Sequence, residues 1–131
     1  MKQICTSLAL GAVLLLTSFT AQRGSIEEVI SALRSGNASK LASYFDANVG
    51  LTLPDKSDSY SKAQAQLIIK DFFDNNNVTG FVLKHKGEGA GGSQYCVGTL
   101  QTSAGNYRTN VFMRRKDGEE VIKEIRFQSI E

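Results

Sequence analysis

Four residues with side chains capable of acid–base or nucleophilic chemistry are spread along the chain: Asp46, His85, Tyr107 and Lys123. A general base must lie within hydrogen-bond reach of a substrate proton in order to act. The four are far apart in sequence, so only the fold could bring them together. Each also has an ordinary structural role, such as a turn aspartate or a core tyrosine, and both interpretations remain open.

His85 and Lys123 are the sharpest of these candidates. His85 alternates with Phe81 and Leu83, which predicts that it faces inward from a strand. There it could be a general base, or a structural or edge histidine. Lys123 is predicted to lie among apolar residues, where an amine needs an acidic partner or loses its charge. It could hold an anionic ligand or act as a nucleophile, or its stem could pack at the sheet margin.

Other reactive residue types give weaker indications. No spacing among the acidic, histidine and cysteine residues supplies a set of metal ligands. Cys96 is interpreted as a packed small hydrophobe, because no Cys-His-Asn or Cys-His-Asp arrangement is evident. Tyrosines could line a pocket together with Asp46, although aromatic residues at such spacings are more often part of a core: Tyr44, Tyr60, Tyr95 and Tyr107.

The segment Gly87-Glu88-Gly89-Ala90-Gly91-Gly92 matches the G-x-G-x-x-G spacing of dinucleotide-binding loops. Those loops lead from a strand into a helix whose N-terminus faces the pyrophosphate. Here the next segment, SQYCVGTLQT, is rich in strand-forming residues, so no helix would receive a phosphate. We therefore predict a connection between two antiparallel strands and no bound cofactor.

Residues 1–21 have the pattern of a secretory signal peptide. Lys2 precedes an uncharged stretch whose apolar core, residues 8–16, is short for a membrane-spanning helix. An uncleaved anchor is the alternative. We predict export to the periplasm or the extracellular space in a bacterium, a mature chain that starts at residue 21 or 22, and no stable membrane insertion after cleavage. Cys5 leaves with the signal, so Cys96 would be the only remaining cysteine.

The rest of the chain, residues 22–131, has the length of one domain. Over the full sequence, fifteen Lys and Arg residues against thirteen Asp and Glu residues give a nearly neutral balance, which provides no electrostatic footprint for nucleic acid.

Hydrophobic spacing predicts an α+β order of elements. Capping boxes at Ser25 and Ser61 begin a first helix and a long helix over residues 61–75, and Gly36-Asn37 separates the first helix from a short second one. A strand over residues 49–53 ends at Pro54, before a short extended piece. From Val78 the pattern becomes twofold and predicts an antiparallel meander of four strands, over residues 79–86, 94–102, 106–115 and 119–128.

The last hairpin determines which side chains share a face of the sheet. A two-residue turn at Asp117-Gly118 would mix apolar and charged residues on each face, whereas a three-residue loop over residues 116–118 keeps them apart. We predict the three-residue loop. It turns a mostly apolar set inward: Tyr107, Thr109, Val111, Met113, Val121, Lys123, Ile125 and Phe127. It also leaves an apolar set on the other face as a candidate dimer or partner surface, unless these are scattered exposed residues: Val97, Phe112 and Ile122.

The order of elements resembles that of the NTF2-like superfamily, in which a curved sheet wraps a long helix into a cone. The segment IEEVISALRSGNASKLASYFDANVGLTL, residues 26–53, is similar to its helix pair and first strand, and YSKAQAQLIIKDFF, residues 60–73, to its core helix. More closely, the chain resembles small exported bacterial NTF2-like domains of unknown function. The resemblance implies a fold that is often dimeric through its sheet and that serves both enzymes and binding domains.

The residues and the resemblance together predict an exported, non-catalytic domain that binds a small apolar or anionic ligand or another protein, with a homodimer as a further option. The alternative is an enzyme of isomerase, cyclase or dehydratase type, which would use His85, Lys123, Tyr107 and Asp46. Two of these four meeting within hydrogen-bond reach in a pocket would favour the enzyme. A cone filled by Phe72, Phe73, Met113 and Phe127 would oppose it.

Overall fold

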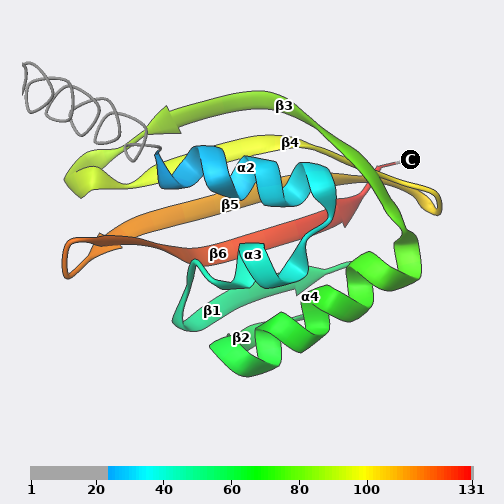
Figure 1. Ribbon diagram of the computed structural model, residues 1–131, viewed down its shortest axis with the longest axis horizontal. Coiled ribbons are helices and arrows are strands. Elements are labelled where there is room, and N and C mark those ends of the chain that lie inside the picture. The colour runs from blue at the N-terminus through cyan, green and yellow to red at the C-terminus, as the bar shows by residue number, and fades with distance from the viewer. Residues whose placement is uncertain (1–23, 131) are drawn as a thin grey trace, which may run out of the picture.

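The computed structural model describes residues 24–130. In that part of the chain, three α-helices cover one face of a six-stranded sheet (Figure 1). The helices are α2 (Ser25–Ser35), α3 (Ala38–Ala42) and α4 (Lys62–Asn76). The strands are β1 (Phe45–Leu53), β2 (Lys56–Ser61), β3 (Val78–Glu88), β4 (Gln94–Thr102), β5 (Gly105–Lys116) and β6 (Glu119–Ser129). The predicted α+β class and order of elements are confirmed.

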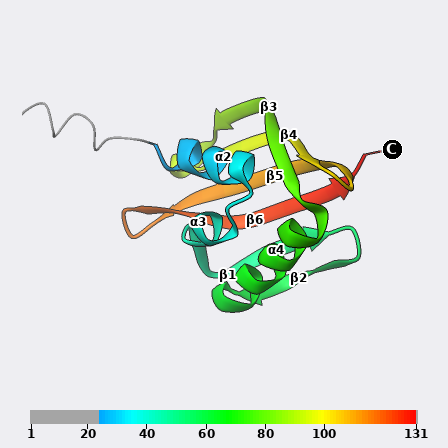
Figure 2. The ribbon, with the colours of Figure 1, turned by 45° about the vertical axis from the view of Figure 1, so that its right-hand side comes forward.

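The sheet is curved and open, with the strand order β2-β1-β6-β5-β4-β3 (Figure 2). Strands β3 to β6 form the predicted antiparallel meander, and β1 returns to pair with β6 in parallel. The two ends of the sheet twist toward the helices, so the helices lie in its hollow (Figure 2). We call the face turned away from them the outer face. No helix in the described part is long and apolar enough to cross a bilayer.

The helix ends follow the predicted capping chemistry at most positions. The Asn37 and Ser61 side chains accept hydrogen bonds from the backbone N–H groups of Lys40 and Gln64, each three residues on. Gly36 ends α2 in the left-handed conformation, at a φ of 65°. The predicted cap at Ser25 is wrong, because Ser25 is the first helical residue and Gly24, which has no side chain, occupies the cap position.

The predicted loop of the β5–β6 hairpin is also wrong. Lys116 pairs with Glu119, so Asp117 and Gly118 form a two-residue turn, and both have positive φ, as the tightest hairpin turns require. The mixing of faces that argued against this turn does not occur, since a β-bulge between Phe112 and Met113 shifts the register and leaves Lys123 as the extra residue of β6.

The bulge changes the predicted faces. Ile122 pairs with Met113 and is fully buried beneath the helices, so it cannot belong to an exposed dimer surface. A second bulge, between Leu83 and His85, leaves Lys84 without a partner and moves His85 to the outer face, opposite Val97. The inward placement of His85 is therefore wrong for the same physical reason.

The hollow of the sheet is filled by packed side chains. The rings of Phe72 and Phe73 on α4 contact that of Phe127 on β6, with centroids 5.0 Å and 6.0 Å apart. Met113 and Phe127 are fully buried, and Phe72 and Phe73 are nearly so. The interior of the cone is a close-packed core.

Candidate ligand-binding pocket

A cavity opens at the mouth of the cone, between α4 and the turn that joins β1 to β2. Its volume is about 380 Å³. The sequence positions it through two local features. Pro54 and Asp55 form the turn, since Leu53 pairs with Lys56 and proline suits the first turn position. On α4, residues three and four apart share one face, which aims the helix residues at this turn.

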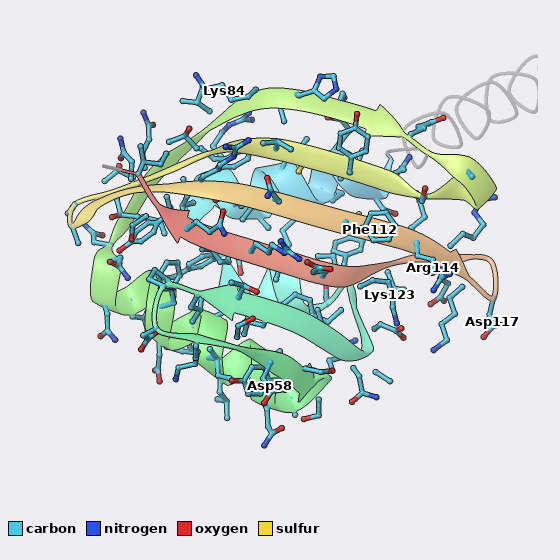
Figure 3. The ribbon with its side chains drawn as sticks, turned by 180° about the vertical axis from the view of Figure 1, so that it is seen from behind. Asp58, Lys84, Phe112, Arg114, Asp117 and Lys123 are labelled. Carbon is cyan, nitrogen blue, oxygen red and sulfur yellow. The ribbon has the colours of Figure 1, made fainter. Side chains whose placement is uncertain are left out.

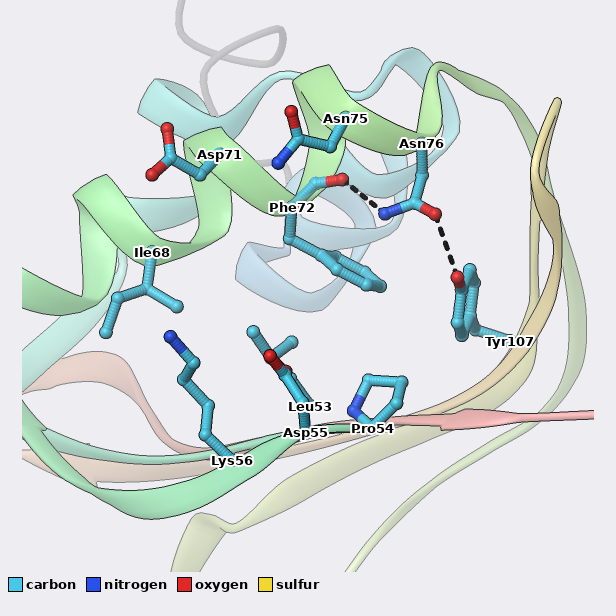
Figure 4. A pocket seen from close by; sticks show the side chains of 10 residues that line it. All are labelled: Leu53, Pro54, Asp55, Lys56, Ile68, Asp71, Phe72, Asn75, Asn76 and Tyr107. Atoms are coloured by element: carbon cyan, nitrogen blue, oxygen red, sulfur yellow. Dashed lines mark hydrogen bonds between the residues drawn. The ribbon is translucent and has the colours of Figure 1, made fainter.

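Apolar side chains form the floor of this mouth pocket (Figure 4). Leu53 and Pro54 lie below, and Ile68 and Phe72 descend from the helix. The Phe72 ring meets the Tyr107 ring edge-on, with centroids 5.0 Å apart and planes at 68°. This contact closes the inner end of the pocket against the aromatic core.

Polar groups line the rim and the inner wall. Tyr107 donates its hydroxyl hydrogen to the Asn76 side-chain oxygen over 2.8 Å, and the Asn76 amide donates to the Phe72 carbonyl over 2.8 Å (Figure 4). These two hydrogen bonds hold the side chains of the inner wall in place. Asn75 and Asp71 lie on the α4 side of the opening, opposite the turn.

Three charged residues surround the opening: Asp55, Lys56 and Asp71. Within residues 24–130 no ion pair joins any of them to an opposite charge. Figure 4 shows the Lys56 side chain extending from the turn toward α4, with its nitrogen on the side of Ile68.

Of the four candidates for chemistry, only Tyr107 lines the mouth pocket. His85 is exposed on the outer face, where its ring nitrogen Nε2 lies 2.9 Å from the Tyr95 hydroxyl. Asp46 and Lys123 do meet, with a separation of 2.8 Å between carboxylate and ammonium, but they are not among the residues that line this pocket. The four do not converge on one cavity.

Asp46 and Lys123 belong to a three-residue ion cluster with Lys116. Each lysine contacts a different oxygen of the Asp46 carboxylate, Lys116 at 3.0 Å, and only 8% of the aspartate side chain is exposed. The hydrogen bonds from Lys123 and then from Lys116 hold the pKa of Asp46 well below its usual range. Lys123, seen on the outer face in Figure 3, is extruded by the β-bulge, so the predicted inward lysine is an outward one with an acidic partner.

The outer face also carries a shallow depression of about 300 Å³. Tyr95, Val97 and Phe112 form its apolar wall, and Phe112 is 42% exposed (Figure 3). The Asn110 side-chain oxygen within it is buried and has no hydrogen-bond partner among the described residues. Two of the three residues predicted for a partner surface, Val97 and Phe112, therefore share this face, whereas Ile122 does not.

The remaining features have structural roles. Cys96 is buried, and burial raises the pKa of its thiol to about 12. The glycine-rich segment connects the antiparallel strands β3 and β4, and Gly91 and Gly92 have φ values of 69° and 80°. No helix follows it to receive a phosphate, as predicted. In the described part of the chain, no group of three His, Cys, Asp or Glu residues could hold a metal ion.

Sequence reasoning missed most of the mouth pocket. Among the predicted candidates only Tyr107 lies there, and Pro54 was interpreted only as the end of a strand. The signal was present as polar residues beside the apolar stripe at the end of the long helix, Asp71 and Asn75. Without the parallel pairing of β1 with β6, nothing showed that the Pro54-Asp55 turn would lie opposite them.

The fold defines the class of this protein as NTF2-like. It is similar, at 11% identity and a TM-score of 0.57, to an NTF2-like protein of unknown function from Cytophaga hutchinsonii ATCC 33406, over 80% of this chain and 86% of that one. A likeness at this identity shows the fold alone.

The chain belongs to the DUF4783 family, described as a domain of unknown function, whose family model matches residues 26–128. Two solved structures of DUF4783 family proteins are similar to it. One from Bacteroides uniformis ATCC 8492 has 32% identity and a TM-score of 0.78, and covers 82% of this chain and 99% of its own. One from Bacteroides fragilis YCH46 has 31% identity and a TM-score of 0.75, and the match covers 83% of this chain and 100% of that one. The comparison with curated proteins finds no match.

Proposed function

We propose that this chain is an exported, non-catalytic domain that binds a small ligand in the mouth pocket. The observation that carries the proposal is the packing of Phe72, Phe73 and Phe127 in the hollow of the sheet. Because these rings fill the interior, a ligand would bind outside the hollow, and the mouth pocket offers it the apolar floor of Leu53 and Ile68. Apolar floors with a few positioned polar groups are typical of small-molecule sites.

The distribution of the reactive groups favours binding over catalysis. The one pair of former candidates that meets, Asp46 with Lys123, is an ion pair in which the lowered pKa of Asp46 keeps its carboxylate ionised. A carboxylate held in this way is a poor proton acceptor at neutral pH. The Tyr107 hydroxyl in the mouth pocket donates a hydrogen bond to the Asn76 side-chain oxygen, which is a structural role.

The proposal is tested by asking what the protein carries when it is purified from its natural host. We expect denaturing extraction and mass spectrometry to release a small molecule from the wild type. Ile68→Trp, which places an indole in the cavity, should abolish the signal. Leu67→Trp is the matched control, since Leu67 is 65% exposed and does not line the pocket. Equal retention by both variants, or no ligand in the wild type, would count against the proposal.

A second candidate function, assembly through the outer face, is favoured by a separate observation. Phe112 is exposed beside Tyr95 and Val97. A homodimer on this face would cover the exposed ring.

Light scattering of the mature protein tests this surface. The wild type should have the mass of a dimer, and Phe112→Asp that of a monomer, because a charge would be buried unpaired at the contact. Leu67→Asp, on the helix side, should leave the dimer intact. A monomeric wild type would refute the outer-face dimer and leave the mouth pocket untouched.

A further inference from the structure

The polar groups of the mouth pocket offer both donors and acceptors in a small space. Each of Asn75, Asn76 and Tyr107 can do both, since an amide has two donor hydrogens and a carbonyl oxygen, and a hydroxyl donates once and accepts twice. The internal chain from Tyr107 through Asn76 to the Phe72 carbonyl leaves one Asn76 hydrogen and the Tyr107 lone pairs unused. The Asn75 side chain forms no hydrogen bond within the described residues.

The charges at the opening have both signs. Lys56 offers three donor hydrogens, and Asp55 and Asp71 offer only acceptors. No ion pair joins them within residues 24–130, so all three remain available. A simple anion would benefit from Lys56 but face two carboxylates, and a simple cation would face the ammonium group of Lys56, which extends from the turn toward α4 (Figure 4).

An uncharged ligand with several hydroxyl groups avoids both conflicts. Its hydroxyls can donate to Asp55 and Asp71 and accept from Lys56, and they can do either with the asparagines. Hydrogen bonds to charged groups are the stronger ones, so such a ligand would use the unpaired charges well. The C–H faces of a ring would meet the apolar floor formed by Leu53, Pro54 and Ile68.

We propose that the ligand of the mouth pocket is an uncharged polyhydroxylated ring, that is, a monosaccharide or the terminal unit of a sugar chain. This inference rests on the proposed function, because it specifies the ligand class of the same pocket. It differs from the apolar or anionic ligand that the sequence suggests, and the reason is the mixture of unpaired charges at the opening.

The test is a ligand titration of the ¹⁵N-labelled protein, residues 22–131, followed by NMR. The DUF4783 structures support the use of this part alone, since nearly their whole length matches it. The probes are methyl glycosides of glucose, galactose and mannose, together with hexanoate as an anion and hexylamine as a cation. We expect at least one glycoside to shift the amide signals of Lys56, Asn75 and Asn76 in a saturable way.

Matched variants show whether the contacts are those proposed. Lys56→Met should weaken glycoside binding about tenfold, by the loss of one charged donor. Lys84→Met, on an exposed strand position away from the pocket, should have no effect (Figure 3). Equal binding by both variants would overturn the role of Lys56 and with it the proposal.

The probes separate this inference from the function on which it rests. Shifts confined to the pocket with hexanoate or hexylamine, and none with the glycosides, would overturn the sugar class and leave a small-ligand pocket standing. No shift in the pocket with any probe would overturn the sugar class and also count against the proposed function.

Discussion

Replacing Asp46 with asparagine should destabilise the fold, because one buried carboxylate holds two lysines. Asparagine keeps the shape of the side chain but removes its charge, and its amide group would then face an ammonium group, donor against donor. Lys123 on β6 and Lys116 at the end of β5 would lose the contact that ties both strands to β1.

The size of the effect follows from the exposure of the three groups. Hydrogen bonds to charged groups contribute about 1.5–3 kcal/mol each when buried. Here the carboxylate is 8% exposed, but Lys123 and Lys116 are 34% and 53% exposed, so water screens both pairs. We therefore expect Asp46→Asn to lower the free energy of unfolding by about 1–2 kcal/mol and the melting temperature by roughly 5–10 °C.

The pH dependence of this loss identifies its cause. The pKa of Asp46 is lowered in the folded state from an ordinary value of 3.8, so its contribution is complete above that value and is lost as the pH falls toward the folded-state pKa. The stability difference between wild type and Asp46→Asn should be constant from about pH 5 to pH 7. It should shrink as the pH falls below about 4.

Urea unfolding at a series of pH values, followed by circular dichroism, measures this difference. Asp117→Asn is the control, because Asp117 is an exposed turn residue with positive φ that asparagine tolerates. It should change stability by less than about 0.5 kcal/mol. If Asp46→Asn cost no more than this control at pH 7, or if its cost did not diminish in acid, the three-residue cluster would not stabilise the fold as described.

Three further results are expected. In urea unfolding, Gly98→Ala should lower the free energy of unfolding by about 3 kcal/mol or more, because the new methyl carbon would lie 2.5 Å from the Val82 carbonyl oxygen. Gly50→Ala, whose methyl carbon would lie 3.5 Å from its nearest neighbour, should lower it by about 1 kcal/mol or less. Cys96 should resist a thiol reagent at pH 8 in the folded protein and react at once in denaturant; fast reaction in the fold would contradict its burial and raised pKa. Intact-mass measurement of the exported protein should show a start at residue 21 or 22, and a retained residue 1 would refute signal cleavage.

Most of the fold could be predicted from local chemistry. The apolar stripe of the long helix gave α4, with Ile69 and Phe72 buried, and the twofold pattern after Val78 gave four strands close to their observed bounds. Caps at Asn37 and Ser61 are decided by a few neighbouring atoms, so sequence alone identifies them.

The faces of the strands could not be predicted as reliably, because a bulge is a property of two strands at once. One extra residue at Lys123 reverses the side of every residue toward the turn, which buries Ile122 and sends Lys123 outward. The bulge at Lys84 does the same to His85. Neither position carries a glycine or another local mark, so an unbroken alternation was the natural prediction.

The mouth pocket depends on long-range pairing even more strongly. Lys56 and Asp71 are brought to one opening only because β1 adds to the sheet beside β6 and carries its turn under α4. The spacing of polar residues on α4 shows which could line a cavity, but it does not show what lies opposite.

An experimental structure of the protein purified from its natural host tests the central claim most directly, because it shows where a retained ligand lies. We expect density for a small molecule between α4 and the β1–β2 turn, in contact with Ile68 and Lys56, with Phe72 and Phe127 still packed against each other. Density inside the hollow of the sheet, with those two rings displaced, would contradict the claim.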